Sequence, residues 1–366
     1  MRVGVTSSVL LGAAGLLAGG ACGGGGRLTG SGGGAGTVSS GRAGSQMMTG
    51  SGGSGPAGAG GTGPTECIAV PRPAAPVPPD VLIALDTSPS MNDGFDGACA
   101  GGCGAASKWA AATASIEAVA DGSTAATNWG LDLMSNGQNV CNTGGVAVSP
   151  GPATGAQIRA ALTGRSTPPG LALPGNTPAS AAIADAVADR LGATDLGQQI
   201  IVLVTDGVPD CKPGAPDALA NDADGAIQTI TDATTAGIQT CVIGLGTAAG
   251  PADATLAQMA AAAYGSCPAS PAYTSVSSGA DLTDELNTIA TQGGACRFAI
   301  PPPPTTDGTT TRGNISVFIN GTSIPMDPND GWMYANVSQT VLRLSGDACT
   351  AARGQSVSVI FNCLTE

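Results

Sequence analysis

Short apolar runs alternate with alanine-rich amphipathic stretches through the middle of this chain. The run VLIAL at 81–85 contains no polar residue, which is typical of a strand buried on both faces in a parallel sheet. Further strands are predicted at 128–134, 146–148, 199–205, 240–245 and 272–276. Helices are predicted between them at 107–120, 157–162, 178–191, 218–236, 252–263 and 280–290. This alternation predicts an α/β fold with a doubly wound, mostly parallel sheet.

The pattern changes after the proline run IPPPP at 300–304. From 314 to 320 the apolar residues Ile315, Val317 and Ile319 occupy every second position, as in an antiparallel strand with one buried face. Additional short strands are predicted at 332–334, 339–344 and 356–361. Residues 297–366 are therefore predicted to form a small C-terminal β module, and residues 67–296 the main domain.

The amino terminus has the features of an export signal. Residues 1–21 carry one arginine, an apolar stretch and small residues before Cys22, and residues 22–66 form a Gly/Ser-rich flexible tether. The segment resembles a bacterial lipoprotein signal, which implies lipidation of Cys22 and attachment to the cell envelope, most simply the outer membrane. Ordinary secretion after cleavage at the same bond is the alternative. No later stretch approaches the ~20 apolar residues of a spanning helix.

Composition and charge exclude several classes of function. The net charge of −13 provides no basic surface for nucleic acid or anionic lipid, so a membrane contact is expected only through the lipid anchor. The complete absence of histidine excludes Ser-His-Asp catalysis and histidine-ligated zinc. Aromatic residues make up 3% of the chain, so the core must consist mainly of alanine, valine, leucine and isoleucine.

The cysteine count fits an oxidising compartment. Of the 11 cysteines, lipidation of Cys22 would leave an even set that can form disulfides. Cysteines at the same edge of the predicted sheet are expected to pair, which gives Cys67–Cys296 and Cys241–Cys267, and Cys349–Cys363 is expected to join the last two strands. The four remaining cysteines lie at the other edge and are expected to pair among themselves: Cys99, Cys103, Cys141 and Cys211. A Cys₄ metal site is disfavoured because the chain lacks two CxxC motifs.

Oxygen-bearing side chains follow two of the apolar strands. Asp86, Ser88 and Ser90 come directly after the strand at 81–85, and Asp206 follows the strand at 199–205. The carboxyl ends of parallel strands share one edge, where ligands bind in open α/β sheets. Thr177 precedes a predicted helix that starts at the same edge, and it is expected to cap that helix. Carboxylates and hydroxyls suit a hard cation such as Mg²⁺, Mn²⁺ or Ca²⁺.

The motifs DTSPS, GNTP and LVTDG, in this order, resemble the von Willebrand factor type A domain and its metal-ion-dependent adhesion site. The resemblance covers about residues 79–296 and implies a Rossmann-type sheet. It implies that Ser88, Ser90 and Thr177 coordinate Mg²⁺, or Mn²⁺ or Ca²⁺ in its place, while Asp86 and Asp206 hold waters and orient the hydroxyls. An open coordination position would accept an acidic side chain from a protein partner. The loop at 92–106 is longer than usual in the family.

Three functions remain open from the sequence. The first is a divalent-cation-dependent protein-binding module tethered to the cell envelope, and the second is a structural envelope protein whose metal only stabilises the fold. The third, a hydrolase using Asp86 or Ser88, lacks an evident base, because the chain has no histidine and only two lysines, Lys108 and Lys212. We therefore expect a protein that is not an enzyme. The sequence does not indicate the oligomeric state.

Overall fold

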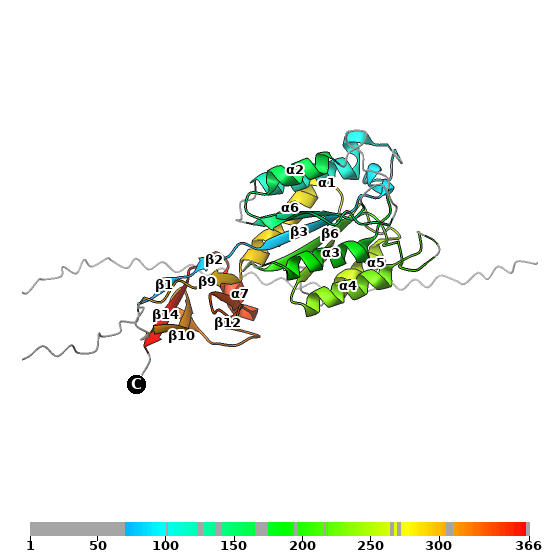
Figure 1. Ribbon diagram of the computed structural model, residues 1–366. Coiled ribbons are helices and arrows are strands. Elements are labelled where there is room, and N and C mark those ends of the chain that lie inside the picture. Colours follow the sequence, from blue (N-terminus) through cyan, green and yellow to red (C-terminus); the bar gives the residue numbers. More distant parts are fainter. Residues whose placement is uncertain are drawn as a thin grey trace, which may run out of the picture. The chain divides into compact units, whose positions relative to one another are not determined.

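The computed structural model describes residues 70–99, 102–122, 127–135, 141–164, 175–193, 197–215, 217, 219–263, 267–268, 272–304 and 310–363 (Figure 1). The predicted signal peptide, the tether, Cys22 and Cys67 lie outside these residues. Within the described ranges, none of the helices has the length and apolar character needed to cross a membrane.

The main domain is built on a six-stranded sheet with the order β5-β4-β3-β6-β7-β8. Every neighbouring pair in it is parallel except β4 and β5, which are antiparallel. The doubly wound, mostly parallel fold predicted from the sequence is thus confirmed. The strands are β3 (Asp80–Leu85), β4 (Asn128–Leu133), β5 (Val146–Gly151), β6 (Gln199–Thr205), β7 (Gln239–Leu245) and β8 (Tyr273–Val276).

Helices cover both faces of this sheet (Figure 1). One face packs against α1 (Lys108–Gly122), α2 (Gly155–Thr163) and α6 (Gly279–Gly294). The other face packs against α3 (Ala179–Leu191), α4 (Ala223–Thr235) and α5 (Asp253–Ala262). Because both faces are covered, β3 is buried at every position, as its uninterrupted apolar run predicts.

A buried acid fixes the register at the amino edge of the sheet. Asp80 lies opposite Asn128 on one side and Gln199 on the other. Its carboxylate accepts hydrogen bonds from the Asn128 amide at 2.7 Å and the Gln199 amide at 2.6 Å. Since a one-residue slip of either strand would separate these groups and deprive a buried carboxylate of a hydrogen bond, the amide pairs favour one alignment.

A second buried acid, Asp132, lies in β4, and the residue is fully shielded from solvent. Burial, with an additional contribution from the nearby Asp185 carboxylate, raises the pKa of Asp132 to about 7, although the backbone N–H of Leu133 opposes this shift. The folded protein therefore holds this proton at pH values where an unfolded aspartate has lost it.

The C-terminal β module contains two four-stranded sheets, ordered β1-β14-β10-β11 and β12-β13-β9-β2. Side chains from both sheets and from α7 (Gly346–Ala352) form one core, which includes Phe298, Val317, Leu342 and Phe361. The strands are β1 (Arg72–Pro73), β2 (Ala75–Pro76), β9 (Arg297–Ala299), β10 (Thr310–Ile319), β11 (Thr322–Ile324), β12 (Trp332–Tyr334), β13 (Val341–Leu344) and β14 (Val357–Cys363).

Two of these strands come from the proline-rich segment that precedes the main domain. β1 pairs with β14, and β2 pairs with β9, so residues 72–76 extend the sheets of the C-terminal module. The predicted division at 296/297 assigned these residues to the main domain. Prolines are tolerated here because β1 and β2 are edge strands.

Four disulfides join described cysteines: Cys99–Cys103, Cys141–Cys211, Cys241–Cys267 and Cys296–Cys349. The last of these shows that the predicted Cys67–Cys296 and Cys349–Cys363 pairs are wrong. Cys296 directly precedes β9, and its carbonyl accepts a hydrogen bond from the backbone N–H of Leu344 at the end of β13. The following helix α7 carries Cys349, so the β9–β13 pairing brings the two cysteines together.

Peptide mapping under non-reducing conditions tests this correction. Digestion of the oxidised protein should release a peptide in which Cys296 is linked to Cys349, because their α-carbons lie 5.1 Å apart. The peptide containing Cys241 and Cys267 serves as an internal control in the same digest. Recovery of a Cys67–Cys296 peptide would contradict the observed pairing.

The buried Asp132 predicts a pH dependence of folding stability. Since its folded pKa of about 7 exceeds the unfolded value of ~3.9, the folded state binds the proton more tightly. Stability from this group should therefore fall as pH rises from about 4 to about 7 and stay constant above that range. The loss is at most about 4 kcal/mol, because a tenfold change in proton affinity corresponds to ~1.4 kcal/mol.

Asp132→Asn removes this titration, and urea unfolding of both proteins between pH 4.5 and 8 measures the difference. The free energy of unfolding of the variant, minus that of the wild type, should rise with pH and then level off. A difference that is independent of pH would show that Asp132 titrates normally.

Candidate cation site

The site lies at the carboxyl edge of the sheet, where the neighbouring strands β3 and β6 end. Leu85 pairs with Val204, and the N–H of Asp86 donates to the Val204 carbonyl at 2.8 Å. Asp86 and Asp206 therefore lie next to each other, just beyond the ends of these two strands. Both carboxylates are shielded from solvent, because Asp86 and the Asp206 side chain are each 0% exposed.

Asp86 is held by donors from three segments. Its Oδ1 accepts a hydrogen bond from the Ser88 backbone N–H at 2.7 Å. Its Oδ2 accepts from the Thr205 hydroxyl at 2.6 Å and lies 3.5 Å from the Thr177 hydroxyl. Burial, and next the negative charge of Asp206, raise the pKa of Asp86 to about 7 despite these donors. The positive charge and donors around Asp86 are therefore not sufficient to keep its pKa at the ordinary value for an aspartate.

Asp206 has a different set of partners. One of its oxygens accepts a hydrogen bond from the Ser90 hydroxyl at 2.8 Å, and the other forms a 2.5 Å ion pair with the Lys108 ammonium. The Ser90 and Ser88 hydroxyls in turn lie 2.9 Å apart. The two serines thus connect the Asp86 side of the site to the Asp206 side.

Thr177 lies at the site, but it does not have the helix-capping role that the sequence predicts. It does not cap α3, whose N-cap is Pro178 without any side-chain cap bond. Its hydroxyl faces Asp86 instead, and its backbone N–H donates to the Asp210 carboxylate at 2.7 Å. Burial raises the pKa of Asp210, and this hydrogen bond partly opposes the shift.

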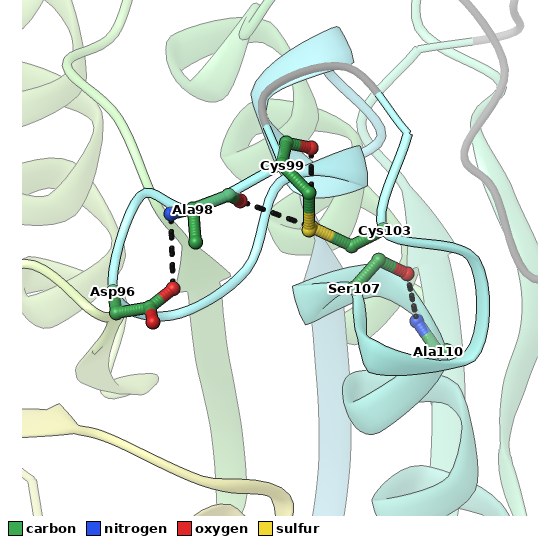
Figure 2. The surroundings of a disulfide bond; sticks show 6 residues. All are labelled: Asp96, Ala98, Cys99, Cys103, Ser107 and Ala110. Carbon is green, nitrogen blue, oxygen red and sulfur yellow. Dashed lines mark hydrogen bonds between the residues drawn. A yellow bond between two sulfur atoms is a disulfide. The ribbon is translucent and has the colours of Figure 1, made fainter.

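The long loop that follows Ser90 leads back to the site. A disulfide between Cys99 and Cys103 closes its tip, and the Ser107 hydroxyl caps α1 by accepting from the Ala110 N–H at 3.1 Å (Figure 2). The N–H of Lys108 donates to the Asp93 carbonyl at 2.9 Å. The loop therefore starts α1 at the edge of the site, which allows Lys108 to reach Asp206.

The structure brings the five residues selected from the sequence into one connected cluster: Asp86, Ser88, Ser90, Thr177 and Asp206. Sequence reasoning missed Thr205, Lys108 and Asp210. Thr205 could have been found, because it directly precedes Asp206 in the same motif. The other two had no local signal, since each reaches the cluster from another part of the fold.

The donor set fits a hard divalent cation. It consists of hydroxyl and carboxylate oxygens, which are the ligand types that Mg²⁺, Mn²⁺ and Ca²⁺ prefer. Across the residues that the structure describes, no group of three or more Cys, Asp or Glu side chains is arranged to hold a metal ion. An ion at this edge would therefore depend on the serine and threonine hydroxyls as well as on Asp86 and Asp206.

No protein-family model and no curated protein matches this chain. Among solved structures, it is similar to BatB from Bacteroides thetaiotaomicron, with 18% identity and a TM-score of 0.39 over 57% of this chain and 95% of that one. It is also similar to the manganese-loaded Plasmodium vivax TRAP protein, with 16% identity and a TM-score of 0.40 over 61% and 78% of the two chains.

A third similar structure is the von Willebrand factor type A protein from Catenulispora acidiphila. The identity is 14% and the TM-score 0.38, over 78% of this chain and 57% of that one. At these identities the likenesses concern the fold alone. The doubly wound architecture of this protein follows from its own sheet order and helix layers.

Proposed function

We propose that this protein binds a divalent cation at the carboxyl edge of its sheet and uses it to capture an acidic side chain of a protein partner. The observation that carries the proposal is the contact network of Asp86, Ser88, Ser90, Thr177 and Asp206. These residues come from three separate segments of the chain. A structural turn would not require hydroxyls from Ser90 and Thr177 to meet acids that follow different strands.

The residues divide into two roles. The hydroxyls of Ser88, Ser90 and Thr177 are the proposed ligands, and Asp86 and Asp206 orient these hydroxyls and any bound water. When bound, the ion supplies positive charge and an open position for an incoming carboxylate. Because hydroxyl ligands are neutral, they leave most of that charge available to the partner. Mg²⁺ is the proposed ion, with Mn²⁺ or Ca²⁺ as substitutes.

Ser90 is exposed whereas Ser88 and Thr177 are buried, so the site is open to solvent on one side. An open side is needed for a partner residue to reach the ion. The Ser90 hydroxyl also donates a hydrogen bond to Asp206, so a ligand bound to Ser90 would lie close to this buried acid.

The proposed location is the cell envelope or the extracellular space. The signal-like residues 1–21, the proposed lipid anchor at Cys22 and the Gly/Ser-rich composition of residues 22–66 support export. The disulfides in the described part of the chain fit an oxidising compartment. The alternative function is that of a structural envelope protein in which the ion only stabilises the fold.

Removal of one proposed ligand tests the cation site. Thr177→Val deletes a buried hydroxyl with little change in volume and should weaken Mg²⁺ binding at least about tenfold, which corresponds to ~1.4 kcal/mol. Calorimetric titration with Mg²⁺ measures the affinity. The melting temperature gives a second readout: saturating Mg²⁺ should raise it strongly in the wild type and only slightly in the variant.

Thr154→Val provides a matched control. Thr154 is also a buried threonine next to a helix start, but its hydroxyl donates to the Trp129 carbonyl at 2.6 Å, away from the site. This control should lose some stability while keeping the Mg²⁺ affinity of the wild type. Equal Mg²⁺ affinity in both variants would contradict the assignment of Thr177.

A peptide array separates capture of a partner from simple stabilisation. Peptides with a central aspartate or glutamate should bind the Mg²⁺-loaded protein better than the same peptides with asparagine or glutamine, and chelation should remove the difference. Stabilisation by Mg²⁺ without any preference for acidic peptides would favour the structural alternative.

A further inference from the structure

Lys108 is the one lysine of this chain that contacts the candidate site, and its ammonium forms a 2.5 Å ion pair with Asp206. Its side chain is only 11% exposed, and that of Asp206 is fully buried. Because little water screens this pair, the Coulomb attraction between its two charges is stronger than in an ordinary surface ion pair. The ammonium therefore neutralises one of the two acids on which the proposed cation depends.

The position of Lys108 is unfavourable by local rules. It is the first residue of α1, and the amino end of a helix carries partial positive charge that favours acids over bases. Neither capping nor the helix dipole accounts for a lysine here. The ion pair with Asp206 explains a lysine at this position, because the carboxylate offsets the unfavourable interaction of the ammonium with the helix end.

A divalent ion at the hydroxyls would change this balance. Ser90 joins the proposed ligand set to Asp206 through a 2.8 Å hydrogen bond, so an ion beside Ser90 would lie close to the carboxylate that Lys108 now contacts. Two positive charges near one carboxylate repel each other, and the repulsion grows as water is excluded. The lysine and the ion therefore compete for Asp206.

We propose that Lys108 is a built-in competitor of the divalent cation. It stabilises Asp206 when no ion is bound, and it is displaced towards solvent when the ion enters. This inference rests on the proposed cation site and adds a regulatory residue to it. Its consequence is that the protein keeps a stable ion-free state and binds the ion only above a concentration that Lys108 helps to set.

Calorimetric titration with Mg²⁺ compares the wild type with Lys108→Met, which keeps an apolar stem and removes the charge. The variant should bind Mg²⁺ about tenfold more tightly or better, and its ion-free form should melt at a lower temperature because Asp206 has lost its counter-charge. Lys108→Arg should retain the weaker affinity. Lys212→Met, a change at an exposed lysine, should behave like the wild type.

Amine labelling of the unmodified protein gives a readout that does not depend on a variant. The chain has only two lysines, so acetylation by an activated ester followed by mass spectrometry compares Lys108 directly with the exposed Lys212. Lys108 should react slowly without divalent ions and severalfold faster in saturating Mg²⁺. Lys212 should react at the same rate with and without Mg²⁺.

The possible results separate this inference from the proposed function. Mg²⁺ binding with equal affinity in wild type and Lys108→Met, together with unchanged labelling of Lys108, would overturn the competition while leaving the cation site in place. Absence of Mg²⁺, Mn²⁺ and Ca²⁺ binding in both proteins would overturn the cation site and the competition with it. Tighter binding together with faster labelling supports both.

Discussion

The parallel pairing of β3 with β6 places two acids next to each other in a water-excluded position, and much of the surrounding structure compensates for this. Asp86 and the Asp206 side chain are both shielded from solvent, and the negative charge of Asp206 adds to burial in raising the pKa of Asp86. Hydroxyl and backbone donors surround Asp86, whereas Asp206 is neutralised mainly by Lys108. The proposed ion would add positive charge beside this acidic pair.

The opposite edge of the sheet is fixed by a different mechanism. Asp80 accepts hydrogen bonds from the amides of Asn128 and Gln199, and it also interacts electrostatically with the Arg297 guanidinium. These side-chain amides favour the register in which β3 pairs with β4 and β6. The alanine-rich helices pack closely on both faces, which suits a core with few aromatic residues.

The C-terminal β module ties together distant parts of the chain. Strand β1 pairs with β14, and strand β2 with β9, before the chain enters the main domain at β3. The Cys296–Cys349 disulfide then links the segment after α6 to α7. The segment that leads to the main domain therefore supplies one edge strand to each sheet of the module.

The sequence alone determined the features that depend on local pattern. Uninterrupted apolar runs identified the buried strands. Acids and hydroxyls directly after those strands identified four residues of the candidate site, because parallel strands end at a common edge, and the predicted helix start identified Thr177 as the fifth. Tertiary structure decided the features that depend on which segments meet. Thr177 faces Asp86 rather than capping α3, and Lys108 reaches Asp206 through the fold of its loop. Cys349 pairs with Cys296, which precedes β9, rather than with Cys363 in β14. These contacts join residues far apart in the chain, so neither spacing nor periodicity carries a signal for them.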